Sequence, residues 1–159
     1  MVNTLILVTV ENISRVADIN FKECIMDTER TFIMLKPVCI QRGLVGEVIS
    51  RIERKGYRIS DAKMLHLSQE LLDEHYAHMV NRPYYPQIVE YMMSGPVLAL
   101  IVEGMNVVLG TRALMGATEF EDRVAGTIRG DLSYCVRFNL IHGSDSPENA
   151  EIEIKRFFG

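Results

Sequence analysis

The order of strand-like and helix-like segments along residues 31–159 limits the possible folds more than any other feature of the sequence. Short apolar or alternating runs predict four strands, at residues 31–35, 57–67, 97–102 and 134–138. Helical spacing of apolar residues separates these runs, so the predicted order is β-α-β-α-α-β-α-β-α. Its two β-α-β halves favour a ferredoxin-like βαββαβ sandwich, an α/β (α+β) fold in which helices cover a four-stranded antiparallel sheet.

The helices are predicted from apolar spacing and from residues that favour helix ends. The spacing or a capping residue indicates helices at or near Leu44, Ser68, Ile88, Asn106 and Ser146. Asn106 is expected to cap a helix that reaches about Met115. Residues 116–131, which are rich in Gly, Thr and charge, predict a long loop with a function of its own. The last helix begins with a capping serine, a proline and an acid in Ser146-Pro147-Glu148.

The composition is that of a globular protein with one core. The chain has 159 residues, of which 48% are hydrophobic and 24% charged, and a mean hydropathy of +0.08. A chain of this length is expected to form one domain. Its 17 Lys and Arg against 21 Asp and Glu give a net charge of −4 and a pI near 5.6, which exclude a broadly basic nucleic-acid coat. We therefore expect a soluble protein with no specific nucleic-acid partner and no membrane association.

The cysteines and the first residues bear on the cellular compartment. Cys24, Cys39 and Cys135 form no CxxC pair, so they are expected to be ordinary thiols in a reducing compartment. The N-terminus lacks the positively charged region of a signal peptide, and its apolar run is far shorter than the roughly 20 residues that span a bilayer. A cytoplasmic protein is predicted.

The chain is divided into an N-terminal extension, residues 1–28, and a domain, residues 29–159. The extension holds a short apolar run and then apolar residues at helical spacing, so a strand followed by a helix is one interpretation. The other is that Met26 is the true start and that the preceding residues are an upstream translation. The sequence leaves both interpretations open.

Residues 139–146, with the sequence Asn-Leu-Ile-His-Gly-Ser-Asp-Ser, are the strongest local signal of a functional site. They lie between a predicted strand and the start of the last helix, where free N–H groups and the helix dipole favour a phosphate. An imidazole with the ordinary pKa of about 6.5 keeps a lone pair at neutral pH, so His142 can attack a phosphoryl group without a separate base. Gly143 is expected to let the backbone approach the ring. The alternative is a surface-loop histidine followed by a turn glycine.

Three cationic residues in separate segments indicate an anion site in this acidic protein: Lys36, Arg112 and Arg129. Arginine forks match phosphate oxygens, and each charge-assisted hydrogen bond contributes roughly 1.5 to 3 kcal/mol. Taken singly, each residue can equally be a solvated surface charge. Glu153 borders the buried face of the last helix, where it either orients His142 or its serine neighbour or simply lies at the edge of the apolar face.

The other histidines of the chain do not predict a metal site. His66, His75 and His78 show no ligand spacing with carboxylates or cysteines. His75 lies on an apolar helix face and is predicted to be a packed histidine. The tyrosines between residues 76 and 91 are predicted to lie in the core or in a groove.

Four segments share residues, order and spacing with one protein family. They have the sequences ERTFIMLKP (29–37), QRGLVGE (41–47), GTIRGD (126–131) and NLIHGSDS (139–146). On these segments the chain, from about residue 29 to its C-terminus, resembles the nucleoside diphosphate kinases. The resemblance implies a ferredoxin-like protomer in a homo-hexamer or homo-tetramer. It also implies ping-pong transfer of the γ-phosphate of ATP or another nucleoside triphosphate to a nucleoside diphosphate through a phosphohistidine. Mg²⁺ would be carried by the nucleotide phosphates, with no metal site in the protein itself.

The resemblance implies a role for each matching residue. His142 would be phosphorylated, Glu153 would support it through Ser144, and Tyr76 would approach the transferred phosphate. The implied nucleotide-binding residues are Lys36 and Asn139 at the ribose hydroxyl and phosphate region, Arg112, Thr118 and Arg129 at the phosphates, and Tyr84 and Ile88 at the base. Lys36 would also belong to the catalytic group.

The sequence departs from the family pattern mainly in its loops. Val38 and Cys39 stand where Asp and then Gly or Ala are usual, which bears on the cap of the next helix. Phe120 and Ala125 replace prolines of the long loop, which bears on loop rigidity and subunit contacts. Arg137 replaces a glycine near the base cleft, where it could crowd the base or add a contact. These changes motivate an alternative function, a catalytically impaired nucleotide-binding regulatory or interaction module, which an assay of nucleoside triphosphate formation separates from the kinase.

Overall fold

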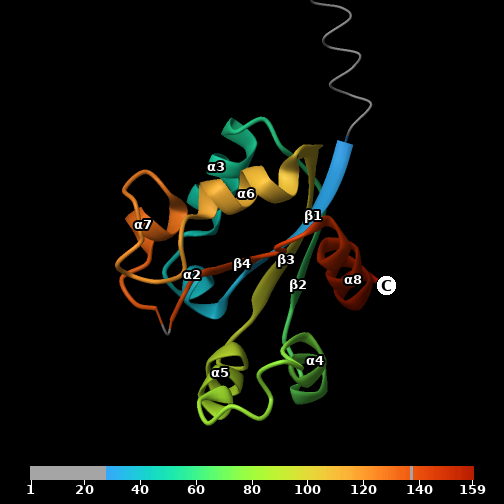
Figure 1. Ribbon diagram of the computed structural model, residues 1–159, viewed down its shortest axis with the longest axis vertical. Helices are drawn as coiled ribbons and strands as arrows, with labels where there is room; N and C mark the ends of the chain where they lie inside the picture. The colour runs from blue at the N-terminus through green and yellow to red at the C-terminus, as the bar shows by residue number, and fades with distance from the viewer. Residues whose placement is uncertain (1–27, 137) are drawn as a thin grey trace, which may run out of the picture.

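The computed structural model describes residues 28–136 and 138–159 (Figure 1). The elements in these residues are β1 (Thr28–Leu35), α2 (Pro37–Gln41), α3 (Val45–Arg54), β2 (Arg58–Leu65), α4 (Gln69–His75), α5 (Tyr85–Met92), β3 (Val97–Met105), α6 (Val107–Met115), α7 (Ile128–Leu132), β4 (Ile141–Gly143) and α8 (Pro147–Phe158). The predicted extension lies outside the described residues except for Thr28, which is the first residue of β1. None of the helices in the described ranges has the length and apolar character needed to cross a bilayer.

The strands form one antiparallel sheet in the order β2-β3-β1-β4, as the ferredoxin-like prediction requires. The register places Phe32 of β1 opposite Ile101 of β3, and Ile33 of β1 opposite Gly143 of β4. β1 and β3 are the central strands, and both are rich in apolar residues without polar alternation. Strands of this composition are stable when both of their faces are buried.

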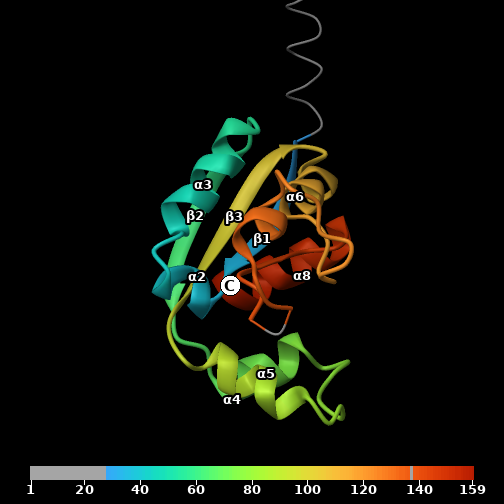
Figure 2. The same ribbon diagram turned by 90° about the vertical axis from the view of Figure 1, so that its left-hand side faces the viewer.

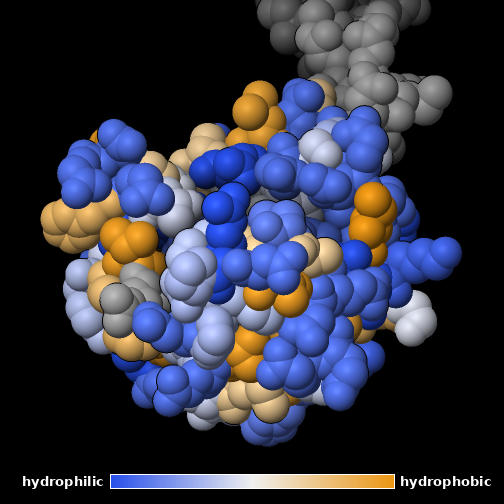
Figure 3. Space-filling model, turned by 60° about the horizontal axis from the view of Figure 1, so that its bottom comes forward, coloured by the Kyte–Doolittle hydropathy of each residue, from blue (hydrophilic) through white to orange (hydrophobic). Residues whose placement is uncertain are grey.

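Helices cover both faces of the sheet, and the two cores follow from the alternation of side chains along β1. Phe32 and Met34 point into a core formed with α4, α5 and α8. Ile33 and Leu35 point into a second core formed with α2, α3, α6 and α7. Figures 1 and 2 show α4 and α5 together at one end of the molecule, below the ends of β2 and β3. The face that includes this end is mainly hydrophilic, with apolar side chains in several separate groups (Figure 3).

The helix predictions are confirmed for α3, α4, α5, α6 and α8, and two of the predicted caps are present. The hydroxyl of Ser68 accepts a hydrogen bond from the N–H of Leu71, and that of Ser146 accepts one from Asn149. The prediction for Asn106 is only partly correct. Asn106 precedes α6, which ends at Met115 as predicted, but its side chain makes no capping hydrogen bond. Its backbone has a left-handed conformation with φ of 50°, which turns the chain directly from β3 into the helix.

The prediction of the fourth strand at residues 134–138 is wrong. Residues 134–136 and 138 form no strand, and β4 instead covers residues of the segment 139–146 that was expected to be a loop. The side chains of Tyr134 and Phe138 are exposed, whereas Leu140 and Ile141 are fully buried. The strand that pairs with the free edge of β1 must have side chains that can be buried. Residues 140–141 have such side chains, so the segment that contains β4 pairs with β1.

The predicted loop 116–131 contains a short helix. Thr127 caps α7 by accepting a hydrogen bond from the N–H of Gly130. The loop lacks the two prolines of the family pattern, but the guanidinium of Arg123 donates to the carbonyls of Thr118, Ser133 and Cys135 and lies 5.5 Å from the ring centre of Phe120. A charged side chain therefore braces the loop. The segment after β1, also expected to be a loop, begins α2 at Pro37, and Val38 and Cys39 are buried there.

Candidate active site

His142 lies on β4 directly opposite Met34 of β1. Residues paired across two strands point to the same face of the sheet, so the imidazole lies on the face that α8 covers. The neighbouring Gly143 points to the opposite face, where a side chain would lie 2.5 Å from Cε of Met115 and 2.9 Å from Cδ1 of Ile33. Gly143 is therefore needed for packing on that face rather than for approach to the ring, which corrects the sequence prediction. A strand also fixes the histidine more rigidly than the expected loop.

Glu153 of α8 holds the imidazole from one side. Its carboxylate oxygens lie 3.0 and 3.1 Å from Nε2 of His142, and the hydroxyl of Ser144 donates to the same carboxylate at 2.5 Å. Burial opposes ionisation of Glu153, but the bonds and charge from His142 and the bond from Ser144 hold its pKa below the usual value. Of the two interpretations of Glu153, the structure therefore supports the contact with His142 and Ser144 rather than a mere position at the edge of the apolar face.

The contact with Glu153 determines the tautomer of His142. An ionised carboxylate only accepts hydrogen bonds, so Nε2 must carry the proton that it donates. In a neutral imidazole the lone pair is then on Nδ1. The structure therefore leaves Nδ1 as the nucleophilic atom of the ring.

His142 and Glu153 line a cavity of about 530 Å³ together with four other predicted residues, Tyr76, Arg112, Thr118 and Arg129. Arg129 is buried and its orientation is fixed. Its guanidinium donates to the carbonyls of Gly116 and Ile141 at 2.6 and 2.9 Å and to the side-chain oxygen of Asn139 at 3.1 Å. Because a guanidinium has five N–H donors, two of them remain for a ligand.

Two glycines of the long loop make this arrangement of Arg129 possible. Gly116, whose carbonyl accepts from Arg129, has a φ of 77°, and a side chain there would lie 2.4 Å from the hydroxyl oxygen of Thr127. A side chain at Gly130 would lie 2.0 Å from the backbone oxygen of Val124. The backbone cannot move aside as a flexible side chain can, so α7 can follow this close turn only with glycine at position 130.

Two cations of the site, the half-buried Lys36 and the buried Arg129, have lowered pKa values, and both remain cationic at neutral pH. Burial, with a smaller effect of Arg129, lowers the pKa of Lys36 to about 8. Burial, followed by the charges of Arg112 and Arg123, lowers the pKa of Arg129 to about 10. Such groups are destabilising in an empty site and gain most from an anionic ligand.

A second cavity, of about 760 Å³, adjoins the first and contains the remaining predicted nucleotide-binding residues, Lys36, Tyr84, Ile88 and Asn139. Tyr84 is half exposed at its mouth, and Ile88 is half buried on α5. Tyr76 and Thr118 line both cavities and therefore lie where the two meet. All predicted site residues except Ser144 thus line one connected space, and Ser144 contacts it through Glu153. Arg137 lies outside the described residues.

Tyr76 is the group most clearly left for a ligand. Its side chain is buried, and within the part of the chain that the structure describes its hydroxyl has no hydrogen-bond partner. Burial, followed by the charge of Glu153, raises the pKa of this phenol above its usual value. Tyr76 therefore stays protonated and can donate a hydrogen bond where the two cavities meet.

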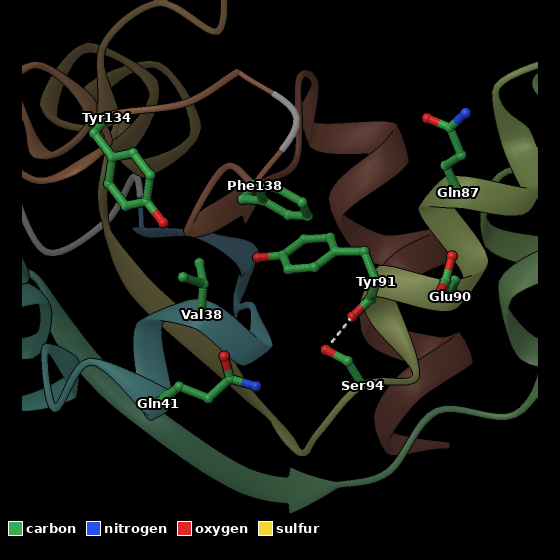
Figure 4. A pocket seen from close by; sticks show the side chains of 8 residues that line it. All are labelled: Val38, Gln41, Gln87, Glu90, Tyr91, Ser94, Tyr134 and Phe138. Atoms are coloured by element: carbon green, nitrogen blue, oxygen red, sulfur yellow. Dashed lines mark hydrogen bonds between the residues drawn. The ribbon is translucent and has the colours of Figure 1, made fainter.

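A third cavity, of about 610 Å³, lies beside the second and shares Gln87, Tyr91 and Phe138 with it (Figure 4). The Tyr91 hydroxyl donates to the backbone oxygen of Asn139 at 3.0 Å, which connects α5 to the segment before β4. Among the described residues, neither a predicted site residue nor a Lys or Arg lines this cavity, and its charged lining residue is Glu90.

Sequence reasoning missed the position of His75. This residue of α4 is packed, as predicted, against Phe32 and Phe157, but its ring centre also lies 4.8 Å from that of His142. Burial, followed by the charge of His142, lowers the pKa of His75 to about 3, so the ring is neutral. The guanidinium of Arg156 lies 3.5 Å from its Nδ1. Nothing in the local sequence connects α4 with β4, because only the folded sheet brings them together.

Comparison with known proteins identifies the family. The model of the nucleoside diphosphate kinase family matches residues 29–159. The chain is a member of the nucleoside diphosphate kinase family.

Two named relatives and two solved structures of nucleoside diphosphate kinases illustrate the similarity. The protein from Symbiobacterium thermophilum is 48% identical over 131 residues, which cover 82% of this chain and 87% of that protein. The protein from Columba livia is 52% identical over 130 residues, covering 82% and 85%. The crystal structure of the apo enzyme from Encephalitozoon cuniculi is 44% identical with a TM-score of 0.80, and covers 82% of this chain and 89% of that one. The structure of the Halobacterium salinarum enzyme in complex with CDP is 43% identical with a TM-score of 0.78, and covers 82% and 87%.

These similarities extend over nearly all of the described residues and include the whole of the site. The predicted fold and family are confirmed. The chain is a nucleoside diphosphate kinase and a nucleotide-binding phosphotransferase, and the interpretation as an impaired regulatory module is not supported.

Proposed function

We propose that this nucleoside diphosphate kinase carries the transferred phosphoryl group on Nδ1 of His142, in a ping-pong exchange between nucleoside triphosphates and diphosphates. The observation that supports this most is the contact of Nε2 with Glu153, in a cavity that Arg112 and Arg129 also line. The contact leaves the ring with its lone pair on Nδ1, and the arginines provide charge for a phosphate. Neither feature alone requires phosphate transfer, but together they supply a nucleophile and a site for its substrate.

The exchange takes two steps that mirror each other. In the first, the Nδ1 lone pair forms a bond to the terminal phosphorus, and the bond from phosphorus to the bridging oxygen breaks with its electron pair on the leaving diphosphate. The ring then carries positive charge, which the carboxylate of Glu153 stabilises through Nε2–H. In the second, a terminal oxygen of the acceptor diphosphate attacks phosphorus, and the electrons of the N–P bond return to Nδ1. Because one phosphoanhydride replaces another, positioning and charge neutralisation account for the catalysis.

The cations and hydroxyls around the histidine have separate tasks in this proposal. Arg112, Arg129 and Thr118 bind the phosphates in the smaller cavity, and Lys36 binds them from the larger one. A lysine with a pKa of about 8 is mostly protonated at neutral pH and can neutralise charge on the transferring group. The hydroxyl of Tyr76, which has no hydrogen-bond partner among the described residues, lies where the two cavities meet and donates to that group.

The larger cavity takes the nucleoside. Tyr84 offers an aromatic face to the base, Ile88 packs against it, and Lys36 and Asn139 contact the ribose and the adjacent phosphates. Stacking recognises the π-face that all bases share, so we expect little preference among nucleobases.

Magnesium enters this proposal with the nucleotide. The carboxylates that line the smaller cavity already have partners in the protein: Glu153 accepts from His142 and Ser144, Asp145 accepts from Asn149, and Glu74 accepts from Arg156. These residues fit an ion held by phosphate oxygens and water rather than by the protein.

Phosphorylation of the protein with γ-labelled ATP tests the proposal. The wild-type protein should acquire an acid-labile, alkali-stable label and pass it to a second nucleoside diphosphate. The His142→Ala variant should lose both labelling and nucleoside triphosphate formation. His66→Ala is the matched control, because His66 is exposed and lines neither cavity. Equal labelling of wild type and His142→Ala would place the phosphoryl group elsewhere.

We also propose a homo-hexamer or homo-tetramer in the cytoplasm. The support for assembly is the edge strand β2, whose side chains are largely exposed, including Met64 at 56%. An edge of this kind offers unpaired backbone groups to another copy of the chain. Both described cysteines carry free thiols, which fits a reducing compartment. Native mass spectrometry measures the first property, and fractionation of cells measures the second.

A further inference from the structure

His75, His142 and Glu153 bring three possible metal ligands together beside the proposed phosphate site. The ligand atoms of these residues all lie within 4.8 Å of one another. Nδ1 of His75 lies 3.7 Å, and Nε2 of His142 3.0 Å, from the same carboxylate oxygen of Glu153. Phosphate transfer uses His142 and Glu153 but gives no task to the nitrogen atoms of His75.

The contact with Arg156 indicates which nitrogen of His75 carries the ring proton. The guanidinium of Arg156 can only donate, and it lies 3.5 Å from Nδ1 of His75, so Nδ1 is the acceptor. The ring proton is therefore on Nε2, which is buried and has no hydrogen-bond partner among the described residues. Nδ1 of His75 carries the lone pair, which Arg156 contacts, and lies 3.7 Å from the Glu153 carboxylate. A metal ion between His75 and Glu153 would take this lone pair in place of Arg156.

The ligand set and its spacing fit zinc. Two imidazole nitrogens and one carboxylate form a recurrent three-ligand zinc set, and the fourth position is taken by water. With metal–ligand bonds of about 2.0–2.1 Å, neighbouring ligands of a tetrahedral ion lie about 3.3 Å apart. The separations of the two histidine nitrogens from the Glu153 oxygen, 3.7 and 3.0 Å, lie on either side of this value, and all three ligand atoms lie within 4.8 Å of one another. Magnesium prefers six oxygen ligands and does not fit this set.

We propose that His75, His142 and Glu153 form a binding site for Zn²⁺ or a similar transition-metal cation, and that the bound ion arrests phosphate transfer. Binding itself is independent of the proposed function, whereas the arrest rests on it. The ion takes the lone pair of Nε2 of His142, and the proton that Nε2 carried moves to Nδ1 by way of water. A neutral imidazole bound through one nitrogen holds its proton on the other. The ion therefore stabilises the tautomer that has no nucleophilic lone pair on Nδ1.

The arginines of the cavity limit the affinity for such an ion. Arg112, Arg129 and Arg156 line the same space and repel a cation. Arg156 is the nearest of them to the ligand group and donates to Glu74 at 2.8 Å, so it is fixed in place. Removing its charge should strengthen metal binding, which is the opposite of the effect of removing a ligand.

Metal titration of the nucleotide-free protein tests the site directly. Zn²⁺ binding is measured by calorimetry, and Co²⁺ binding by its visible absorption, for wild type, His75→Phe, Arg156→Gln and the surface control His66→Ala. Phe fits the aromatic surroundings of His75 but has no ligand atom. Loss of an outer partner of a metal ligand typically costs about 10–100-fold in affinity, so loss of the ligand His75 should cost at least about tenfold. Arg156→Gln should bind more tightly, and His66→Ala should bind as wild type does.

The activity measurement is made separately, with saturating Mg²⁺ and nucleotides. Zn²⁺ should inhibit transfer in wild type and His66→Ala, and His75→Phe should need at least about tenfold more Zn²⁺ relative to its own uninhibited rate. If His75→Phe does not fold, His75→Leu takes its place. Equal Zn²⁺ affinity of wild type and the His75 variant, or loss of binding in His66→Ala, would overturn the site. Zinc binding at His75 without any Mg²⁺-dependent transfer would instead refute the proposed function and leave the site intact.

Discussion

Replacing Lys36 with methionine is expected to stabilise the folded protein at neutral pH while it weakens phosphate transfer. Burial and the nearby Arg129 lower the pKa of Lys36 from 10.5 to about 8. The difference between these values corresponds to about 3 kcal/mol of unfavourable free energy for the charged form. Because Lys36 keeps some exposure to solvent, we expect Lys36→Met to recover about 2–3 kcal/mol. Methionine has a similar length and keeps the contacts of the aliphatic chain.

The pH dependence distinguishes this cause from a change in packing. In the folded protein Lys36 loses its proton near pH 8, and in the unfolded chain near pH 10.5. Between these values the unfolded chain binds one more proton, so the free energy of unfolding of the wild type rises with pH. The advantage of Lys36→Met is therefore complete below pH 8 and disappears above about pH 10.5.

Thermal and urea denaturation at pH 7 and pH 10, at one protein concentration, measure the effect. At pH 7 the Tm of Lys36→Met should be about 4–12 °C above that of the wild type. The exposed Lys55→Met at the end of α3 controls for general charge effects and should show no such difference. The kcat/KM of Lys36→Met should fall at least about tenfold, because a charge-assisted bond to phosphate is lost. A variant that is less stable than wild type at pH 7, or a difference that is the same at both pH values, would refute the reasoning.

Three further substitutions test other parts of the site. Ser144→Ala removes one hydrogen bond to the Glu153 carboxylate, and its kcat should fall about tenfold with little change in the KM for nucleotide; an equal rise in KM would contradict a role through Glu153. Tyr84→Ala should raise the nucleotide KM by the equivalent of about 1–3 kcal/mol, whereas Tyr84→Phe should not, because the ring alone is needed for stacking. Gly143→Val places a side chain against Met115 and should lower the free energy of unfolding by about 1–3 kcal/mol in denaturation experiments; unchanged stability would show that Met115 moves aside freely.

The parts of the fold that were predicted correctly have local signals. The apolar run of β3, the spacing of Val48 and Ile52 in α3, and the Ser146-Pro147 start of α8 each identify an element without reference to the rest of the chain. The burial of both faces of β3 can also be predicted locally, because its apolar run is continuous. Alternate residues of this run point into the two cores. Such elements can be read from a single sequence.

The fourth strand could not be read in this way. β4 has only three residues, and its strand conformation depends on pairing with Ile33, Met34 and Leu35, which lie more than a hundred residues earlier in the chain. Tyr134 and Val136 have a higher local preference for strands, but their side chains are exposed. Pairing with the central strand outweighed local preference, as it often does in sheets.

The candidate site was predictable where a residue's role depends on its motif. The helical position of Glu153 suggested a contact with His142 as one of two interpretations. The sequence also singled out the three cations Lys36, Arg112 and Arg129, and the resemblance implied their roles. The place of His75 was not predictable, because the distance between α4 and β4 is set by the sheet order and by the packing of α4 on Phe32 and Phe157. The same holds for the hydrogen bonds of Arg129 to three separate segments.

The partners of Arg129 explain how a buried cation can remain available to a phosphate. Its three acceptors are amide oxygens of Gly116, Asn139 and Ile141, and among the described residues no carboxylate forms a salt bridge with it. Neutral acceptors orient the guanidinium and offset part of its desolvation, but they leave its full charge unneutralised. A carboxylate in the same place would have to be displaced by each incoming phosphate. The acid nearest the histidine, Glu153, is instead bonded to Nε2, on the side away from Nδ1. The site therefore separates its negative charge from its positive charges by means of the two nitrogen atoms of one imidazole.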